Sequence, residues 1–214
     1  MQLPVWVIVV VVFIVVYILA REALRRYYNA RYEGFFATAH YQEALDTLDA
    51  LPARVTMTTY QQYSRRFFCY EAMENKEMAT RMIDLVVRMR HTPKRQAEVL
   101  TLAFNYFAQI GEKDRAKETL AQLKAAKGAN PAVVTDCQLT YEIVFKKRYD
   151  YIDQMEKMLK KAGPELQGKL CYLLSKQYAN KGDKTHAKQY KRRYEELARA
   201  NAPEPRPNAA EKAE

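Results

Sequence analysis

The sequence predicts an all-α protein in which a single N-terminal transmembrane helix precedes an α-solenoid of about five helix-turn-helix repeats. Three observations lead to this prediction. Residues 3–20 are an unbroken apolar run without a charged or amide side chain. Residues 21–200 contain few glycines. They lack both the alternation of apolar and polar residues that is typical of strands and the Asn-Gly or Asp-Gly turns of hairpins. Large and small apolar residues also recur there at a nearly constant spacing.

The apolar run predicts a transmembrane helix over residues 3–20. Eighteen helical residues extend about 27 Å, which is close to the hydrocarbon thickness of a bilayer. Trp6 and Tyr17 stand near the two ends, where interfacial aromatic residues are expected. A buried core helix is the alternative, but this run has no polar face. No Gly or Pro follows before Glu33, so we expect the membrane helix to continue directly into the first helix of the soluble domain.

The basic residues behind the apolar run predict its orientation. Arg21, Arg25, Arg26 and Arg31 follow the run, whereas only Met1 and Gln2 precede it. The positive-inside rule then places the N-terminus outside and the soluble domain in the cytoplasm, with one pass through a plasma or bacterial inner membrane. A cleaved secretory signal is the alternative, but such signals carry a basic region before the apolar run.

A repeat of about 36 residues organises the region 21–200. Its anchor residues are spaced by 35, 37, 36 and 35 residues, and they are Ala44, Ala79, Ala116, Ile152 and Ala187. A large residue stands nine positions before each anchor: Phe35, Tyr70, Phe107, Ile143 and Tyr178. Another stands seven positions after it: Leu51, Val86, Leu123, Leu159 and Tyr194. A small anchor lets two helices approach closely, and the flanking large residues then fill the groove beside it.

Two of these units resemble tetratricopeptide repeats. Residues 97–131 carry Phe107, Gly111, Ala116 and Pro131 in the order of that family, and residues 168–197 are similar. The other three units are degenerate and are assigned by spacing. The resemblance implies a curved solenoid over residues 21–200, with a concave groove that binds an extended peptide or a partner helix. Residues 201–214 contain three prolines and no bulky apolar side chain, which predicts a disordered tail.

The same resemblance gives candidate partner-binding residues on the first helix of each unit. Alignment to the glycine turns gives Asn105, Gln138 and Lys169. The other groove-facing candidates are Arg65, Phe68, Tyr141, Tyr172 and Lys176. Some members of the family clamp a carboxylate with several cations, but Thr101 and Leu173 occupy two of those positions here. We therefore expect no carboxylate clamp. We expect instead that the groove binds a peptide with acidic and apolar side chains.

The distribution of charge and the sequence motifs limit the classes of function that we expect for this chain. Residues 101–200 contain 20 basic and 12 acidic residues. This excess indicates a solvated face or a contact with anionic lipid. Nucleic acid is not expected as a partner, because the aromatic residues recur at core positions of the repeat. The three histidines are isolated and no nucleophile or phosphate-binding motif occurs, so we expect no catalytic residue, metal or cofactor.

These observations lead to the hypothesis of a membrane-anchored adaptor or scaffold that binds a partner protein and performs no catalysis. The alternative is a non-catalytic subunit of an envelope or lipid or cell-wall biogenesis complex, which contacts anionic lipid through its basic distal repeats. A weaker alternative is self-assembly through Tyr-rich repeat faces.

Cys69, Cys137 and Cys171 each lie among apolar neighbours, where a free thiol acts as a small hydrophobic side chain.

Overall fold

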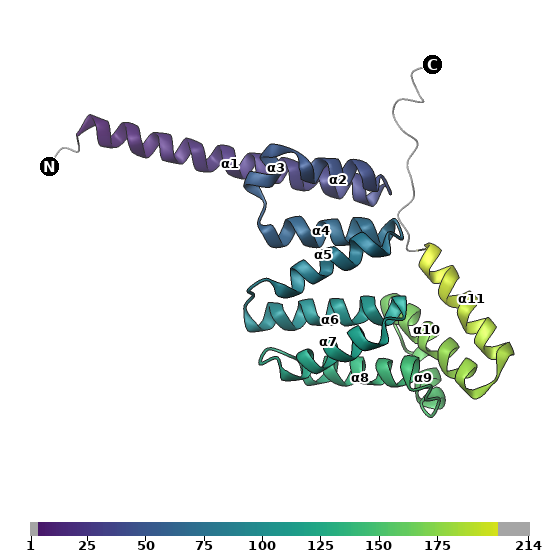
Figure 1. Cartoon of the computed structure of the whole chain (residues 1–214). Coiled ribbons are helices and arrows are strands. Elements are labelled where there is room, and N and C mark those ends of the chain that lie inside the picture. The colour runs from purple at the N-terminus through teal and green to yellow at the C-terminus, as the bar shows by residue number, and fades with distance from the viewer. Residues whose placement is uncertain (1–3, 201–214) are drawn as a thin grey trace, which may run out of the picture. The chain divides into compact units, whose positions relative to one another are not determined.

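The structure, a computed structural model, describes residues 4–200 and is all-helical within them (Figure 1). The predicted disordered tail and Leu3 lie outside the described residues. The helices are α1 (Val5–Ala37), α2 (Tyr41–Asp49), α3 (Leu51–Thr56), α4 (Thr59–Ala72), α5 (Lys76–Arg88), α6 (Pro93–Ile110), α7 (Lys113–Ala125), α8 (Pro131–Phe145), α9 (Ile152–Leu159), α10 (Pro164–Lys181) and α11 (Lys184–Ala200). They form two compact units: unit 1 extends to Val86, and unit 2 begins at Val87.

Helix α1 continues from the apolar run into the folded part of unit 1 without a break, as predicted. It contains 33 residues, which corresponds to a length of about 50 Å. The helix is long and apolar enough to cross a membrane, and none of its most apolar window is buried in the described chain. The Phe13 side chain, for example, is 76% exposed. This part of α1 is therefore not a core helix of unit 1, and Figure 1 shows it projecting beyond α2 and α3.

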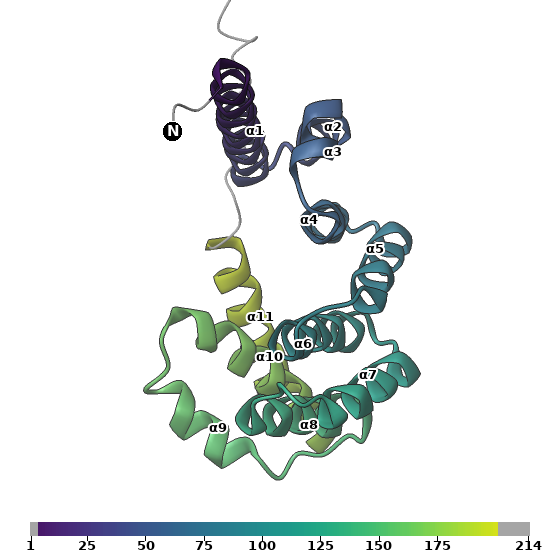
Figure 2. The same ribbon diagram turned by 90° about the vertical axis from the view of Figure 1, so that its left-hand side faces the viewer.

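The second half of α1 packs into unit 1. Helices α2 and α3 both contact α1, and α4 contacts α2 (Figure 2). Tyr32 of α1 is buried in a core with side chains from four other segments, namely Ala44, Leu45, Leu48, Ala53, Met57 and Cys69. The helix that carries the exposed apolar segment is thus also a structural element of the folded unit.

A break after α2 departs from the predicted repeat. Ala50 adopts an extended ψ of 133°, and the short helix α3 then begins at Leu51 with Pro52 in its first turn. Proline suits the first turn of a helix, where the backbone N–H has no helical partner. Leu51 is consequently 73% exposed, so its predicted role in filling the groove beside Ala44 is wrong. Helix α3 instead buries Ala53 and Thr56 against its neighbours.

Unit 2 contains two helix pairs in which consecutive helices pack on one another. Helix α6 packs on α7, and α10 packs on α11. Helix α8 contacts α6, α7 and α10, while α9 contacts α10. One core cluster of unit 2 consists of Ile143, Ile152, Met155, Leu159, Leu170, Cys171, Leu173, Leu174 and Tyr178. The anchor Ala116 is fully buried, as the close approach of α6 and α7 requires.

The five turns that precede the anchor residues have one backbone feature in common. Each contains one residue in the left-handed region, with φ between 56° and 89°, five positions before its anchor: Ala39, Glu74, Gly111, Lys147 and Gly182. In four of the turns, the residue after the left-handed one donates its N–H to a carbonyl oxygen at 2.9 Å. This carbonyl belongs to the large residue that stands nine positions before the anchor. This bond closes a helix C-terminus in the manner of a Schellman motif. The spacings found in the sequence therefore mark equivalent turns.

Candidate functional site

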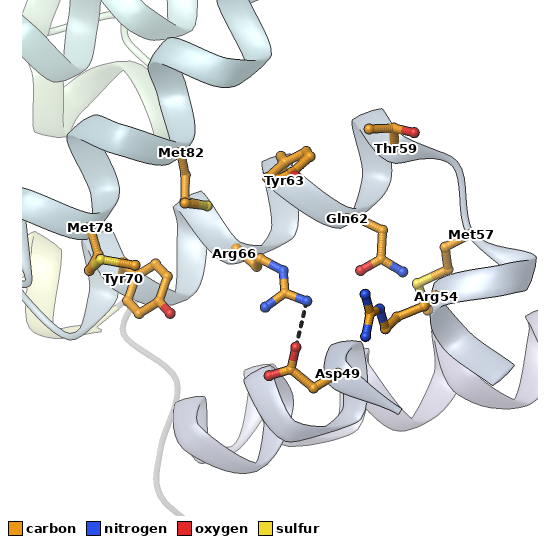
Figure 3. A pocket seen from close by; sticks show the side chains of 10 residues that line it. All are labelled: Asp49, Arg54, Met57, Thr59, Gln62, Tyr63, Arg66, Tyr70, Met78 and Met82. Carbon is orange, nitrogen blue, oxygen red and sulfur yellow. Dashed lines mark hydrogen bonds and ion pairs between the residues drawn. The ribbon is translucent and has the colours of Figure 1, made fainter. Parts of the chain in front are cut away.

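Unit 1 contains an open hollow of about 490 Å³ between the α2–α3 segment and the helices α4 and α5 (Figure 3). We call it the unit 1 hollow. It is lined by Asp49, Arg54, Met57, Thr59, Gln62, Tyr63, Arg66, Tyr70, Met78 and Met82. Its volume lies within the range of about 300–1,000 Å³ that is usual for ligand sites.

Local sequence fixes the walls of this hollow. Helix α4 begins with a capping box, in which Thr58 accepts from the backbone N–H of Gln61 and the Gln61 side chain accepts from that of Thr58. The buried Gln62 side chain donates to the carbonyl oxygen of Ala53 at 2.9 Å, which joins α4 to α3. The break at Ala50 turns α3 toward this junction. The hollow therefore lies beside the break between α2 and α3.

Two arginines give the hollow a positive side. Arg66 donates to Asp49 at 2.8 Å and to the carbonyl oxygen of Leu48 at 3.4 Å, which fixes its guanidinium. Arg54 is exposed, and its side chain makes no hydrogen bond or ion pair with the residues that the structure describes. Figure 3 shows both guanidinium groups in the space between α4 and the α2–α3 segment. One cation is thus held by an acid, and the other is available to an anionic group.

The remainder of the hollow is apolar and adaptable. Met57, Met78 and Met82 line it together with Tyr63 and Tyr70. Thioether side chains rotate freely and adjust to partners of different shape, and tyrosine offers a broad contact area with a polar tip. The hollow thus combines an exposed cation with apolar, adaptable side chains.

A smaller hollow in unit 2 brings together three of the predicted groove residues. Asn105 of α6 lies beside Lys169 and Tyr172 of α10, around a space of about 180 Å³. The other lining residues are Ala108, Gln109, Thr140, Leu173 and Tyr194. Lys169 forms an ion pair with Asp136, and the Tyr172 ring lies 5.6 Å from that of Tyr194. Burial raises the pKa of Tyr172.

The other predicted residues lie elsewhere. Gln138 and Tyr141 line a third hollow, between α7 and α8. The Lys176 ammonium lies over the Tyr172 ring, 5.4 Å from its centroid. Phe68 is 38% exposed on α4, with its ring edge-on to Phe67. Arg65 faces α1, where it contacts Asn29 and Glu33.

None of the residues that line the unit 1 hollow belonged to the predicted set. The prediction assigned partner-binding positions by their place in the repeat, and this hollow arises where the repeat is broken. A signal was present in the sequence, since Pro52 interrupts the second helix of the first unit three residues after Asp49.

Within the described residues, no three His, Cys, Asp or Glu side chains are grouped as ligands of a metal ion.

Comparison with protein-family models, with curated proteins and with solved structures finds no match to this chain.

Proposed function

We propose that this chain is a membrane-anchored, tetratricopeptide-like adaptor that binds a partner protein and performs no chemistry of its own. The observation that carries the proposal is the unit 1 hollow, which lies in the same folded unit as the helix that extends into the exposed apolar segment. A site in the folded unit that includes such a helix would hold its partner close to a membrane, which raises the local concentration of that partner.

The repeat assignment rests on the turns. Five left-handed residues recur at the spacings of the anchor residues, and four turns share one closing hydrogen bond. Units of this kind cannot bury their apolar faces alone, so they stack on their neighbours. We therefore propose an α-solenoid of five helical hairpins, the first of which begins within α1.

The membrane assignment rests on α1. Its apolar segment is exposed, and it is followed by Arg21, Arg25 and Arg26. A water-exposed surface of this kind is unfavourable by about 25 cal/mol for each Å² of apolar area, whereas a bilayer would cover it. The proposed orientation has the N-terminus outside and the folded units in the cytoplasm, because the basic flank follows the span.

The partner feature that best fits the unit 1 hollow is an extended segment with one acidic and one or two apolar side chains. The acidic group would pair with Arg54, which has no partner among the described residues. The apolar side chains would enter between the methionines and Tyr63. Arg66 would stay with Asp49 and shape the wall.

A photo-crosslinking experiment on the full chain in its membrane tests this function. A photoreactive phenylalanine analogue replaces Tyr63 inside the hollow or, as a matched control, Tyr149, which is 49% exposed in unit 2. We expect a discrete protein adduct from position 63 that disappears with Arg54→Glu and persists with the exposed control Arg81→Glu. Identical adducts from both positions, or none from position 63, would refute a binding role for the hollow.

The lipid-contacting alternative has one observation in its favour. Helix α11 has no buried residue and carries Lys184, Lys188, Lys191, Arg192 and Arg193. Two of these cations already pair along the helix, Lys191 with Glu195 and Arg192 with Glu196. A role in lipid binding predicts that the full chain in detergent binds vesicles with anionic headgroups, that salt weakens this binding, and that Lys184→Gln with Lys188→Gln removes it.

A further inference from the structure

A third hollow, between α7 and α8 of unit 2, is strongly basic. It encloses about 550 Å³ and is lined by Lys113, Asp114, Lys117, Leu120, Ala121, Lys124, Gln138, Tyr141 and Lys146. We call it the lysine hollow. Four lysines line it and only one acid does, although the chain contains 25 acidic residues. A space with this charge attracts anions.

Two of the four lysines are available to a partner. Lys113 and Lys117 are exposed, lie one turn apart on α7 and make no hydrogen bond or ion pair with the residues that the structure describes. Like charges at this spacing repel one another and slightly destabilise a helix. An anionic group placed between them would relieve this repulsion.

The other two lysines are held in place by a network around Glu142. Lys124 donates to the Gln138 side chain at 2.7 Å, and Gln138 donates to Glu142 at 2.6 Å. The Lys146 ammonium lies 3.7 Å from the same carboxylate, which also pairs with Arg148 at 3.0 Å. The hydrogen bond from Gln138 and the nearby cations lower the pKa of Glu142. Because this carboxylate stays ionised, Lys124 and Lys146 are positioned before any partner arrives, which reduces the entropy lost on binding.

The floor of the lysine hollow is apolar. Leu120 of α7 and Tyr141 of α8 are only 4% and 6% exposed there, and the exposed Ala121 follows Leu120 on α7. The hollow thus has positive walls and an apolar floor. Gln138 and Tyr141, two of the residues predicted for the concave groove, contribute to this site instead.

We propose that the lysine hollow binds an acidic peptide segment of a partner protein, with carboxylates that flank an apolar or aromatic side chain. This inference rests on the proposed adaptor function and names the chemistry of a partner. Lys113 and Lys124 are separated by about 16 Å along α7, which is the length of about five extended residues. A flat bilayer surface would not reach the floor of a recess, whereas a peptide side chain does.

The test uses the full chain in nonionic detergent micelles and a fluorescein-labelled ten-residue peptide of Glu and Asp around a central Leu. Binding is followed by fluorescence anisotropy. We expect the double variant Lys113→Gln with Lys117→Gln to bind the peptide about tenfold more weakly, because it loses two exposed charge contacts. The matched control is Lys157→Gln with Lys161→Gln, which removes two exposed charges at the same spacing outside the hollow and should change the affinity less than twofold.

A second variant changes Ala121, a lining residue next to the apolar floor of the lysine hollow. Ala121→Glu places a carboxylate among the lysines without enlarging the buried core, and it should abolish peptide binding while the circular dichroism melting curve stays unchanged. A peptide in which Lys replaces every Glu and Asp should not bind to the native chain. Equal weakening by both lysine pairs would overturn the proposal, because it would indicate a general effect of net charge.

Two further outcomes would also overturn it. Binding to phosphatidylserine vesicles that depends on Lys113 and Lys117, without peptide binding, would assign the hollow to lipid. Competition by millimolar inorganic phosphate as strong as that by unlabelled peptide would assign it to a small anion. The photo-crosslink from position 63 separates these failures from a failure of the adaptor function, since it tests a different hollow in a different unit.

Discussion

The guanidinium of Arg65 on α4 lies over the ring of Tyr32 on α1, 4.6 Å from its centroid. The same guanidinium donates to Asn29 at 2.6 Å and to Glu33 at 3.0 Å, and its side chain is only 15% exposed. One cation thus joins α4 to the helix that carries the exposed apolar segment. Arginine can make these contacts at once because its donors are fixed in a plane that also stacks on a ring.

Arg65→Ala should therefore lower the free energy of unfolding of unit 1 by about 2 kcal/mol, through the loss of two hydrogen bonds and the ring contact. Arg65→Lys should recover only part of this loss, since an ammonium cannot bind all three partners together. Urea unfolding of the full chain in micelles, followed by circular dichroism, measures the change. The control Arg81→Ala removes an exposed arginine of α5 and should stay within about 0.5 kcal/mol. Equal losses from Arg65→Ala and Arg81→Ala would show that the contacts of Arg65 do not hold unit 1 together.

Glu74 is one of three residues other than glycine with left-handed backbone angles at the repeat turns, with φ of 56°. A Cβ atom is strained in this region, and glycine is not. Glu74→Gly should raise the melting temperature and stabilise the protein by about 0.5–1 kcal/mol. Arg81→Gly, in the middle of α5, should instead cost about 1 kcal/mol. A loss from Glu74→Gly would indicate that the second turn has another conformation in solution.

Gly128 lies against the start of α6. A Cβ atom added there would stand 2.3 Å from the carbonyl carbon and oxygen of Pro93 and 2.6 Å from the backbone nitrogen of Lys94. Backbone atoms cannot rotate away, so Gly128→Ala should destabilise unit 2 by about 1–3 kcal/mol. Gly168→Ala is the matched control, because nothing lies within 4 Å of its added Cβ and the residue is inside α10. That variant should gain about 0.5–1 kcal/mol. If both variants are neutral in chemical denaturation, the close approach of Gly128 to α6 is absent.

The buried thiols predict a dependence of stability on alkaline pH. Burial raises the pKa of Cys69 and of Cys137 from 9.0 to about 11. A raised pKa means that the folded state favours the neutral thiol, so this contribution is complete below pH 9 and is lost as the pH rises toward 11. Between pH 9 and 11, the double variant Cys69→Ala with Cys137→Ala should lose less stability than the native chain. Parallel pH profiles would contradict this account.

The same shift predicts the reactivity of these thiols. At pH 8 the folded protein has far less thiolate at these two cysteines than the unfolded chain has, because burial raises the pKa of both thiols to about 11. Iodoacetamide should therefore label Cys69 and Cys137 only after denaturation, as mass spectrometry of the digested protein can show. Rapid labelling at both sites in the folded state would indicate that they are open to solvent.

Local patterns in the sequence determined the helical class, the uninterrupted helix α1 and the positions of the turns. Each of these depends on a few neighbouring residues. An apolar run without Gly or Pro continues as a helix, and a turn that closes with a fixed hydrogen bond needs the same spacing in every unit. The anchors at Ala44, Ala79, Ala116, Ile152 and Ala187 each follow such a turn, and the structure places a left-handed residue five positions before each of them.

Only the tertiary structure decided which side chains meet. Arg65 reaches α1, more than 30 residues away, and Gln138 joins the lysines of α7, whereas Asn105 lies with Lys169 and Tyr172. These partners depend on how helices cross and rotate, and on the break at Ala50 that forms the unit 1 hollow. A repeat pattern specifies which positions are small or large, because packing requires it. It does not specify the neighbour of an exposed polar side chain, because that neighbour belongs to another helix.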